Sequence, residues 1–316
     1  MLKERLIKRI LISIGAIFAC FLIYLIPTEE TADVSKIDPP KIDIKKVSIY
    51  LLDNNGMLGK TNVIVNSDND IDIAKELLDI LIIGGKGESS IPSGFKALIP
   101  SETVVNGITS NNGILKIDFN EAILDINMEY EISMLESIIY TLTELPSVDG
   151  IILTISGREL YRLPNSNMVI PLFLDRRFGI NKKYEYTSLD DIKSITTYYV
   201  SKFNDDIYYV PVTKYINDDR EPIKIILEDF TSSNNYMTGL MSYINSNTNL
   251  LKTNIDNDTM ELVFNSYILN DLDNKNILEE VINTISLSVK DNYDVSEVIF
   301  YVDNNEIYKS VLKTIE

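Results

Sequence analysis

The sequence has no histidine and no tryptophan, and it has one cysteine among 316 residues. The lack of His excludes Ser-His-Asp and Cys-His catalysis and every zinc site built on imidazole. A single Cys excludes a disulfide within the chain and a zinc site made of thiolates. We therefore expect no metal and no cofactor, and an enzyme would need a carboxylate pair or a Ser-Lys dyad.

Basic residues are also few, since 29 Lys and Arg stand against 47 Asp and Glu and give a formal net charge of −18. Nucleic acids need Lys and Arg to replace their counterions, so the composition argues against a nucleic-acid partner. Hydrophobic residues make up 45% of the chain, which is enough to bury a core. The length fits one large domain or two medium ones.

Positive charge is concentrated at the N-terminus, where residues 1–9 carry four basic side chains and one Glu. Residues 10–26 then run without a charge to Pro27. As a helix this run would span about 25 Å, at the short end for crossing a bilayer. Basic residues before such a span keep that end in the cytoplasm. We expect residues 1–27 to be a single-pass membrane anchor, with the C-terminal part extracytoplasmic.

Two other interpretations of this segment stay open. One is a signal peptide that is cleaved. The other is a lipoprotein lipidated at Cys20, because Ile17-Phe18-Ala19-Cys20 loosely resembles a lipobox. Phe18 fits that motif poorly and the chain stays apolar after Cys20, so the uncleaved anchor is favoured. Residues 28–46 are polar with a Pro pair, which predicts a stalk.

The remaining chain predicts two copies of one unit. Alternating and helical periodicities predict, in order, a hairpin, a helix, a second hairpin around SNNG, a helix and a strand, over residues 47–65, 66–85, 103–119, 129–145 and 148–156. The order recurs in the second half, where residues 135–143 (LESIIYTLT) align with residues 278–286 (LEEVINTIS). We expect an α+β fold of two tandem copies, residues 47–160 and 194–316, each a small, mostly antiparallel sheet with two helices on one face.

Residues 136–157 gather hydroxyls and carboxylates that resemble catalytic groups. Their apolar residues form one helical stripe, Pro146 prevents the helix from continuing, and Gly150 opens the next strand. Thr141 and Thr143 flank the stripe and can bond back to helix carbonyls. The pattern predicts a joint between a helix and a strand.

The Asp-rich run at residues 68–72 begins like a calcium loop, but Ile73 stands where such a loop needs Gly. Capping of the following helix by Asp70 or Asp72 is the better interpretation.

The segment between the copies, residues 161–193, contains the apolar run MVIPLFL, which we expect to pack in the crevice between domains. It also carries a basic cluster. This cluster consists of Arg176, Arg177, Lys182 and Lys183. Pairing with nearby carboxylates of the chain is the favoured interpretation, and a docking patch for an acidic partner or a lipid headgroup is the alternative.

One set of residues resembles the GerM domain, the sporulation and spore germination module. The resemblance lies in an Ile-Pro, a hairpin with a Gly turn and an Asp near its end, a helix ending in Thr-Leu-Thr-Glu, and a following Val. Those positions are Ile99, Pro100, Gly113, Asp118, Thr141, Leu142, Thr143, Glu144 and Val148. The second copy is degenerate, since Val263 replaces the Asp118 equivalent and the Glu144 equivalent is lost.

The resemblance implies a non-enzymatic, membrane-tethered scaffold at the envelope between mother cell and forespore. Such a protein helps to assemble or localise a transenvelope complex with other envelope or sporulation proteins. Similarity to the ring-building modules of secretion systems leaves a homo-oligomer open.

Two other functions are weighed against this one. A carrier would hold a small ligand or lipid in the inter-domain crevice. A cell-wall hydrolase would use carboxylates drawn from Asp118, Glu136, Glu144 and Asp149, but none is flanked by aromatic residues in the manner of a sugar cleft.

Overall fold

The computed structural model describes residues 14–18, 21, 45–232 and 239–312. The chain divides into two units, Met1–Asp43 and Ile44–Glu316. In the first unit residues 14–18 and 21 are helical, while Cys20, most of the predicted anchor and nearly all of the stalk lie outside the described residues. No helix in the described part of the chain is long and apolar enough to cross a membrane.

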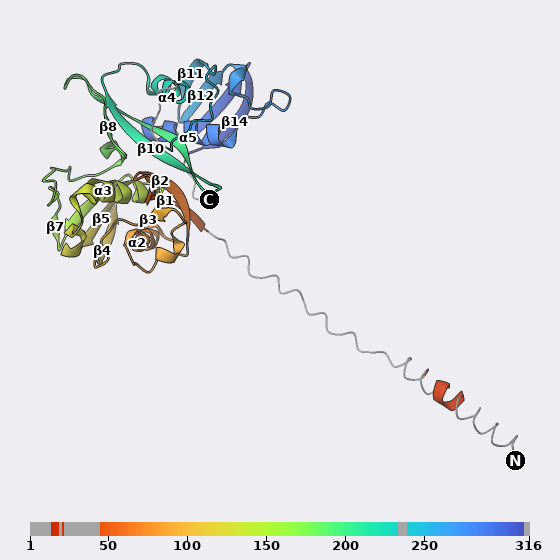
Figure 1. Ribbon diagram of the computed structural model, residues 1–316, viewed down its shortest axis with the longest axis horizontal. Coiled ribbons are helices and arrows are strands. Elements are labelled where there is room, and N and C mark those ends of the chain that lie inside the picture. The colour runs from red at the N-terminus through yellow and green to blue at the C-terminus, as the bar shows by residue number, and fades with distance from the viewer. Residues whose placement is uncertain (1–13, 19–20, 22–44, 233–238, 313–316) are drawn as a thin grey trace. The chain divides into compact units, whose positions relative to one another are not determined.

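The second unit repeats one order of elements (Figure 1). The first copy comprises β1 (Lys45–Asp53), β2 (Leu58–Val65), α2 (Asp70–Leu81), β3 (Phe95–Lys96), β4 (Val105–Asn111), β5 (Ile114–Phe119), α3 (Met128–Leu142), β6 (Gly150–Ile155) and β7 (Arg158–Glu159). A 3-10 turn, η3 (Arg176–Phe178), and β8 (Lys183–Tyr184) follow. The second copy comprises β9 (Lys193–Phe203), β10 (Asp206–Ile216), α4 (Pro222–Thr231), β11 (Leu250–Asp256), β12 (Thr259–Phe264), α5 (Glu279–Asn292), β13 (Glu297–Val302) and β14 (Asn305–Val311). The predicted α+β repeat is confirmed.

The strands form three sheets in the described residues, where the sequence predicts one mostly antiparallel sheet per copy. Each copy has a four-stranded mixed sheet, β4-β5-β6-β7 or β11-β12-β13-β14. Its central pair is parallel, because α3 or α5 makes the crossover between the two strands. The first hairpin of each copy leaves its own sheet, and β2 pairs with β10 so that both hairpins share a third sheet. The prediction is therefore wrong on the number of sheets, while the pairs on either side of each central pair are antiparallel.

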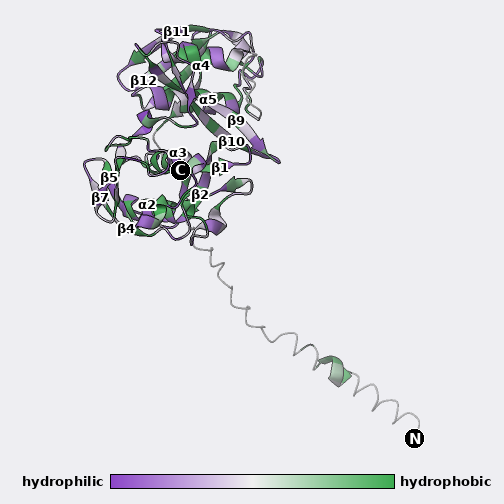
Figure 2. Cartoon of the chain, turned by 60° about the vertical axis from the view of Figure 1, so that its left-hand side comes forward, coloured by the Kyte–Doolittle hydropathy of each residue, from purple (hydrophilic) through white to green (hydrophobic). Residues whose placement is uncertain are grey.

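Each copy has its own apolar core. In the first copy the predicted stripe of α3 is buried, with Ile138, Ile139 and Leu142 fully covered. Figure 2 shows hydrophobic and hydrophilic residues mixed along the strands of both copies. Three residues of the second copy, Tyr198, Tyr209 and Leu287, pack with the first core. The copies therefore meet through packed side chains.

Two helix ends differ from the sequence prediction. The N-cap of α2 is Asn69, whose side-chain oxygen accepts a hydrogen bond from Asp72 N at 3.0 Å, so capping by Asp70 or Asp72 is wrong. Both Asp residues lie in the first turn, near the positive end of the helix dipole. Helix α3 ends at Leu142, before Pro146, and Thr143 Oγ1 donates to Ile139 O at 2.8 Å as predicted.

The segment after β7 packs on the first copy. Leu174 forms an antiparallel bridge with Ile151 of β6, and Ile170 is buried in the first core. The expectation that MVIPLFL packs in the crevice between copies is wrong for this run. The contact with the second copy comes later, where Asn181 Nδ2 donates to the carbonyl oxygens of Leu58 in β2 and Pro211 in β10.

The turn between β4 and β5 has the backbone that SNNG predicts, since Asn112 and Gly113 have φ of 47° and 76°. A Cβ at Gly113 would collide with the Asp149 side chain. We expect Gly113→Ala to lower the free energy of unfolding by roughly 2 kcal/mol, measured by urea denaturation.

Gly107 in β4 is the matched control, because its φ is not positive and a Cβ there meets nothing within 4 Å. Gly107→Ala should leave stability within about 0.5 kcal/mol of the parent. Equal effects of the two substitutions would contradict the assignment of strain to Gly113.

Candidate functional site

A cluster of buried polar side chains lies where the two copies meet, and we refer to it as the interface cluster. Its members come from the first copy, the connecting segment and the second copy. They are Tyr50, Lys60, Glu144, Arg176, Tyr198, Lys290 and Asp291. The members lie on or next to six elements of both copies and the segment between them, namely β1, β2, α3, η3, β9 and α5. The cluster therefore depends on the whole tandem arrangement.

Glu144 is the carboxylate that collects cations in this cluster, and its side chain is 6% exposed. Its Oε1 accepts from Tyr50 Oη at 2.7 Å and from Lys60 Nζ at 3.0 Å. Its Oε2 accepts from Lys290 Nζ of the second copy at 2.8 Å, and Arg176 Nη1 lies 3.3 Å from Oε1. One carboxylate of the first copy thus binds cations from three separate parts of the chain.

Arg176 is the group that joins both halves of the cluster. Its Nε and Nη2 donate to the two oxygens of Asp291 at 2.7 and 3.2 Å. Its Nη2 also lies 2.9 Å from Tyr50 Oη and 2.8 Å from Tyr198 Oη. The guanidinium lies over the Tyr140 ring, 4.3 Å from its centroid. This planar fork with several fixed donors is geometry that Lys cannot reproduce.

The interface cluster has an approximate two-fold symmetry. Tyr50 Oη donates to Glu144, Tyr198 Oη donates to Asp291 at 2.9 Å, and the two hydroxyl oxygens lie 2.9 Å apart. The backbone N–H of each Tyr donates to a hydroxyl on the helix of its own copy, that of Thr141 or Ser288. Each copy therefore contributes the same tyrosine and carboxylate arrangement.

This symmetry corrects the sequence alignment of the two helices. Thr141 and Ser288, like Glu144 and Asp291, are 147 positions apart, as are Gly150 and Glu297 at the starts of β6 and β13. Aligning residues 135–143 with 278–286 gives an offset of 143, one helical turn shorter. Because a shift of four residues keeps the same apolar stripe, the sequence pattern does not distinguish the two alignments. The inference that the Glu144 equivalent is lost is wrong, because Asp291 takes its place.

The electrostatics of the cluster leave one positive charge in excess. Lys60, Lys290 and Arg176 stand against the carboxylates of Glu144 and Asp291. Burial opposes ionisation of Glu144, but the three cations outweigh it and hold its pKa well below the usual range. Burial, with repulsion from Lys290 and Arg176, lowers the pKa of Lys60 to about 8 despite Glu144.

The lowered pKa of Lys60 predicts a pH dependence of stability. Below about pH 8 the Lys60 amine is protonated in both the folded and the unfolded protein. Between about pH 8 and 10.5, the ordinary pKa of Lys, the amine has lost its proton in the folded protein but keeps it in the unfolded chain. Stability then rises with pH, by about 2 kcal/mol for this group between about pH 7 and 9.5. The measurement is the free energy of unfolding of the parent relative to Lys60→Met at each pH. Parallel curves for the two proteins would contradict the assignment.

The four residues of the predicted docking patch are dispersed. Arg176 is in the interface cluster, and Lys182 is buried beside Glu136, with Nζ 3.4 Å from its carboxylate and 3.3 Å from the centroid of the Phe178 ring. Arg177 is 83% exposed and pairs with Asp175 at 2.6 Å. Intramolecular pairing thus describes three of the four. Lys183 is half-buried and has no ion pair among the described residues, so docking stays a prediction that rests on Arg177 and Lys183.

The residues of the family motif hold local structure together. Asp118 accepts from Thr154 Oγ1 and Gly157 N, both at 2.7 Å, and these bonds, the one from Gly157 foremost, lower its pKa. Ile99, next to Pro100, exchanges backbone hydrogen bonds with Leu81 and Ile83 at the end of α2. The remaining members, Leu142 and Val148, are buried in the first core.

The carboxylates considered for a hydrolase each have separate roles. Glu144 is held by cations of the interface cluster. Glu136 is paired with Lys182 and accepts from Asn181 N at 2.9 Å, and burial raises its pKa despite Lys182. Asp118 fixes the turn after β6. The fourth candidate, Asp149, is exposed and its side chain lies beside Gly113.

Recesses among the described residues of the second unit include two of about 990 and 270 Å³. The larger, which we refer to as the inter-copy groove, has a volume of about 990 Å³ and is lined by parts of β1, β2, β10, α5 and β14. Lys60, Lys290 and Glu144 reach it from the interface cluster. The sequence did not predict it, because its walls come from strands and a helix that are distant along the chain.

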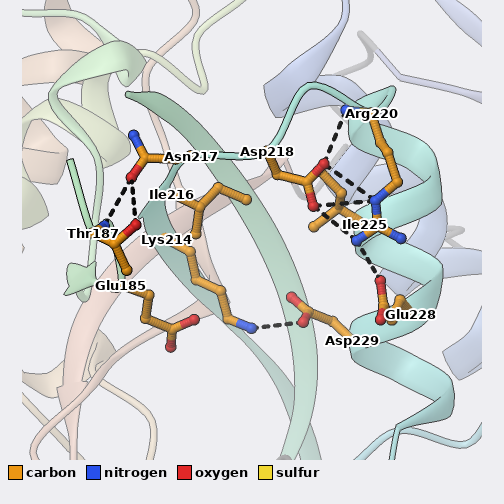
Figure 3. A pocket seen from close by; sticks show the side chains of 10 residues that line it. All are labelled: Glu185, Thr187, Lys214, Ile216, Asn217, Asp218, Arg220, Ile225, Glu228 and Asp229. Carbon is orange, nitrogen blue, oxygen red and sulfur yellow. Dashed lines mark hydrogen bonds and ion pairs between the residues drawn. The ribbon is translucent and has the colours of Figure 1, made fainter. Parts of the chain in front are cut away.

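The smaller recess is a pocket of about 270 Å³ in the second copy (Figure 3). Five of its six charged side chains, all but Glu185, pair with one another: Lys214 Nζ donates to Asp229 at 2.6 Å, and Arg220 Nη2 lies 2.8 and 2.6 Å from Asp218 and Glu228. Among the residues described, no group of three or more Cys, Asp or Glu is placed to hold a metal ion.

Comparison with known proteins agrees with this architecture. The Germane family, described as sporulation and spore germination, matches residues 48–161 and 196–308. The spore germination protein GerM of Bacillus subtilis is 30% identical over 277 residues, which cover 85% of this chain and 74% of that protein. The solved structure of the tandem GerMN domains of that sporulation protein superposes with a TM-score of 0.74 at 29% identity, covering 82% of this chain and 91% of that one. The chain belongs to the Germane family of sporulation and spore germination proteins.

Proposed function

We propose that this protein is a non-enzymatic scaffold of sporulation or germination, tethered to a membrane and facing outside the cytoplasm, that helps to assemble a complex between mother cell and forespore. The observation that carries the proposal is the match to GerM of Bacillus subtilis along most of the chain, in the same tandem arrangement. The basic N-terminus and the apolar run of residues 10–26 support the tether.

The interface cluster gives this scaffold a physical basis. An assembly protein must present its contact surfaces at fixed positions, because flexibility between them costs entropy on binding. Here Arg176 and Glu144 connect the copies through buried ion pairs, and Asn181 connects β2 to β10. The two copies can therefore act as one rigid body.

Deletion of the gene tests the proposal, with a fluorescent fusion to follow the protein during sporulation. We expect fewer heat-resistant or germination-competent spores and fluorescence at the envelope between the two cells. Complementation with the full chain should restore spores, while a version lacking residues 1–27 should not. Normal sporulation and germination in the deletion strain would refute the role.

A carrier of a small ligand is the second candidate, favoured by the volume of the inter-copy groove. Its lining is rich in Lys and Glu, which disfavours an acyl chain and leaves a polar ligand. Native mass spectrometry of the purified protein would detect a retained metabolite. A hydrolase would release muropeptides from cell wall, and we expect none from this protein.

A further inference from the structure

The inter-copy groove is bounded by strand edges. Strand β14 is the last strand of its sheet, and no described strand pairs with its outer edge. Consecutive residues Ser310 and Val311 line the groove. Neighbouring side chains of a strand point to opposite faces of the sheet. Ser310 and Val311 can therefore line the same groove only if the groove runs along the edge of β14.

The direction of the backbone groups on β14 follows from one hydrogen bond. Leu312 N donates to Ser296 O at 2.8 Å, next to the ladder with β13. Because N–H directions alternate along a strand, the N–H of Val311 points to the outer edge. The side chains of Val311 and Tyr308 are 52% and 45% exposed. A backbone donor that pairs with no described strand and apolar side chains thus border the groove together.

The charges in the groove are separated along α5. At one end Lys60 and Lys290 belong to a cluster with one positive charge in excess. At the other end the first turn of α5 presents Glu279 and Glu280, which form no ion pair among the described residues. Eleven residue steps from Glu279 to Lys290 correspond to about 16 Å of helix.

A buried hydroxyl also lacks a partner beside the groove. Ser286 of α5 lines the groove and is 4% exposed. Its Oγ makes no hydrogen bond among the described residues. Thr103 and Thr248, which do not line the groove, have the same property, so an unpaired hydroxyl is not specific to a ligand site.

We propose that the groove binds an extended peptide segment of a partner protein, which adds a strand to the outer edge of β14. A carboxylate of that segment contacts the ammonium groups of Lys60 and Lys290, and a basic side chain contacts Glu279 or Glu280. Strand addition to an open edge is a common mode of peptide recognition, in which backbone hydrogen bonds supply affinity and side chains supply specificity.

The separation of the charges sets the length of the segment. An extended chain rises about 3.3 Å per residue, so about 16 Å corresponds to an acidic and a basic residue about five positions apart. A small anion would use the two lysines alone and leave β14 and the glutamates without a role. The inference rests on the proposed scaffold function and assigns one of its partner sites.

Binding of a peptide library to the full-length protein in detergent tests the proposal. The fluorescent peptides have about six residues, with Asp at one end, Lys at the other and randomised Val, Ile, Thr, Ser and Tyr between them. We expect selected members to bind, measured by fluorescence anisotropy, and to weaken at least tenfold when Asp is replaced by Asn. Their affinity should fall above about pH 8, as Lys60 loses its proton.

Two variants at one position separate the backbone from the side chain. Val311→Pro removes the outward N–H without touching the ladder to β13, and we expect at least tenfold weaker binding. Val311→Thr keeps that N–H and should bind within about twofold of the parent. Circular dichroism spectra establish that both variants fold.

Three results would overturn the proposal. The first is that no peptide of the library binds. The second is that the Val311→Pro and Val311→Thr proteins bind the peptides equally well. The third is that free glutamate displaces a bound peptide as effectively as an unlabelled peptide does. The last would identify a small-anion site. None depends on a sporulation phenotype, so failure here leaves the proposed scaffold function to be judged by the deletion strain.

Discussion

Replacement of Glu144 by Gln is expected to lower the free energy of unfolding by about 3–5 kcal/mol. The substitution keeps the shape of the side chain but removes the charge that binds Lys60, Lys290 and Arg176. Three buried cations would then share the single carboxylate of Asp291. For a unit of this size the melting temperature should fall by roughly 10 °C, measured by differential scanning calorimetry at neutral pH.

Glu221→Gln is the matched control for this experiment. Glu221 pairs with Lys224 across one helical turn at 3.1 Å, and both side chains are largely exposed. Exposed pairs contribute less than about 1 kcal/mol, so the control should melt within about 2 °C of the parent. A Glu144→Gln protein that melts with the control would show that the interface cluster contributes little.

Arg176→Met should change how the protein unfolds as well as how stable it is. Met fills similar apolar volume but leaves Asp291, whose side chain is 1% exposed, without its cation. Breaking a buried pair in this way costs about 3–5 kcal/mol, and here the cost falls on the contact between copies. We expect the parent to unfold in one calorimetric transition and the variant to unfold in two, one for each core.

The neighbouring Arg177 provides the control, because it has the same charge and lies in the same 3-10 turn but is 83% exposed. Arg177→Met should retain a single transition at nearly the parent temperature. A single transition in both variants would mean that other contacts, such as those of Asn181, suffice to couple the copies.

The sequence was a good guide to features that depend on near neighbours. Periodicity located the helices, Asn112 and Gly113 predicted the turn between β4 and β5, and the repeat predicted the tandem architecture. The cap of α2 was misassigned to Asp70 or Asp72 because Asn69 stands beside them and all three residue types cap helices well. Local chemistry alone does not choose among them.

The interface cluster was beyond the reach of the sequence because its partners are far apart in the chain. Glu144 and Lys290 are separated by 146 positions, and neither has a local signal that predicts the other. Arg176 was noted for the density of basic residues around it, and that density indicates charge but not burial. The repeat itself carries one signal. When α3 and α5 are aligned one helical turn further along, Asp291 is placed opposite Glu144.

The shared sheet has a consequence for self-association. The hairpins β1–β2 and β9–β10 face each other as equivalent surfaces do in a two-fold symmetric dimer, with Tyr50 and Tyr198 touching near the axis. A lone copy of this module would leave that surface open and ready to pair with a second molecule. By joining two copies in one chain, the protein occupies the surface internally, so any ring or filament of this chain has to be built from its outer faces.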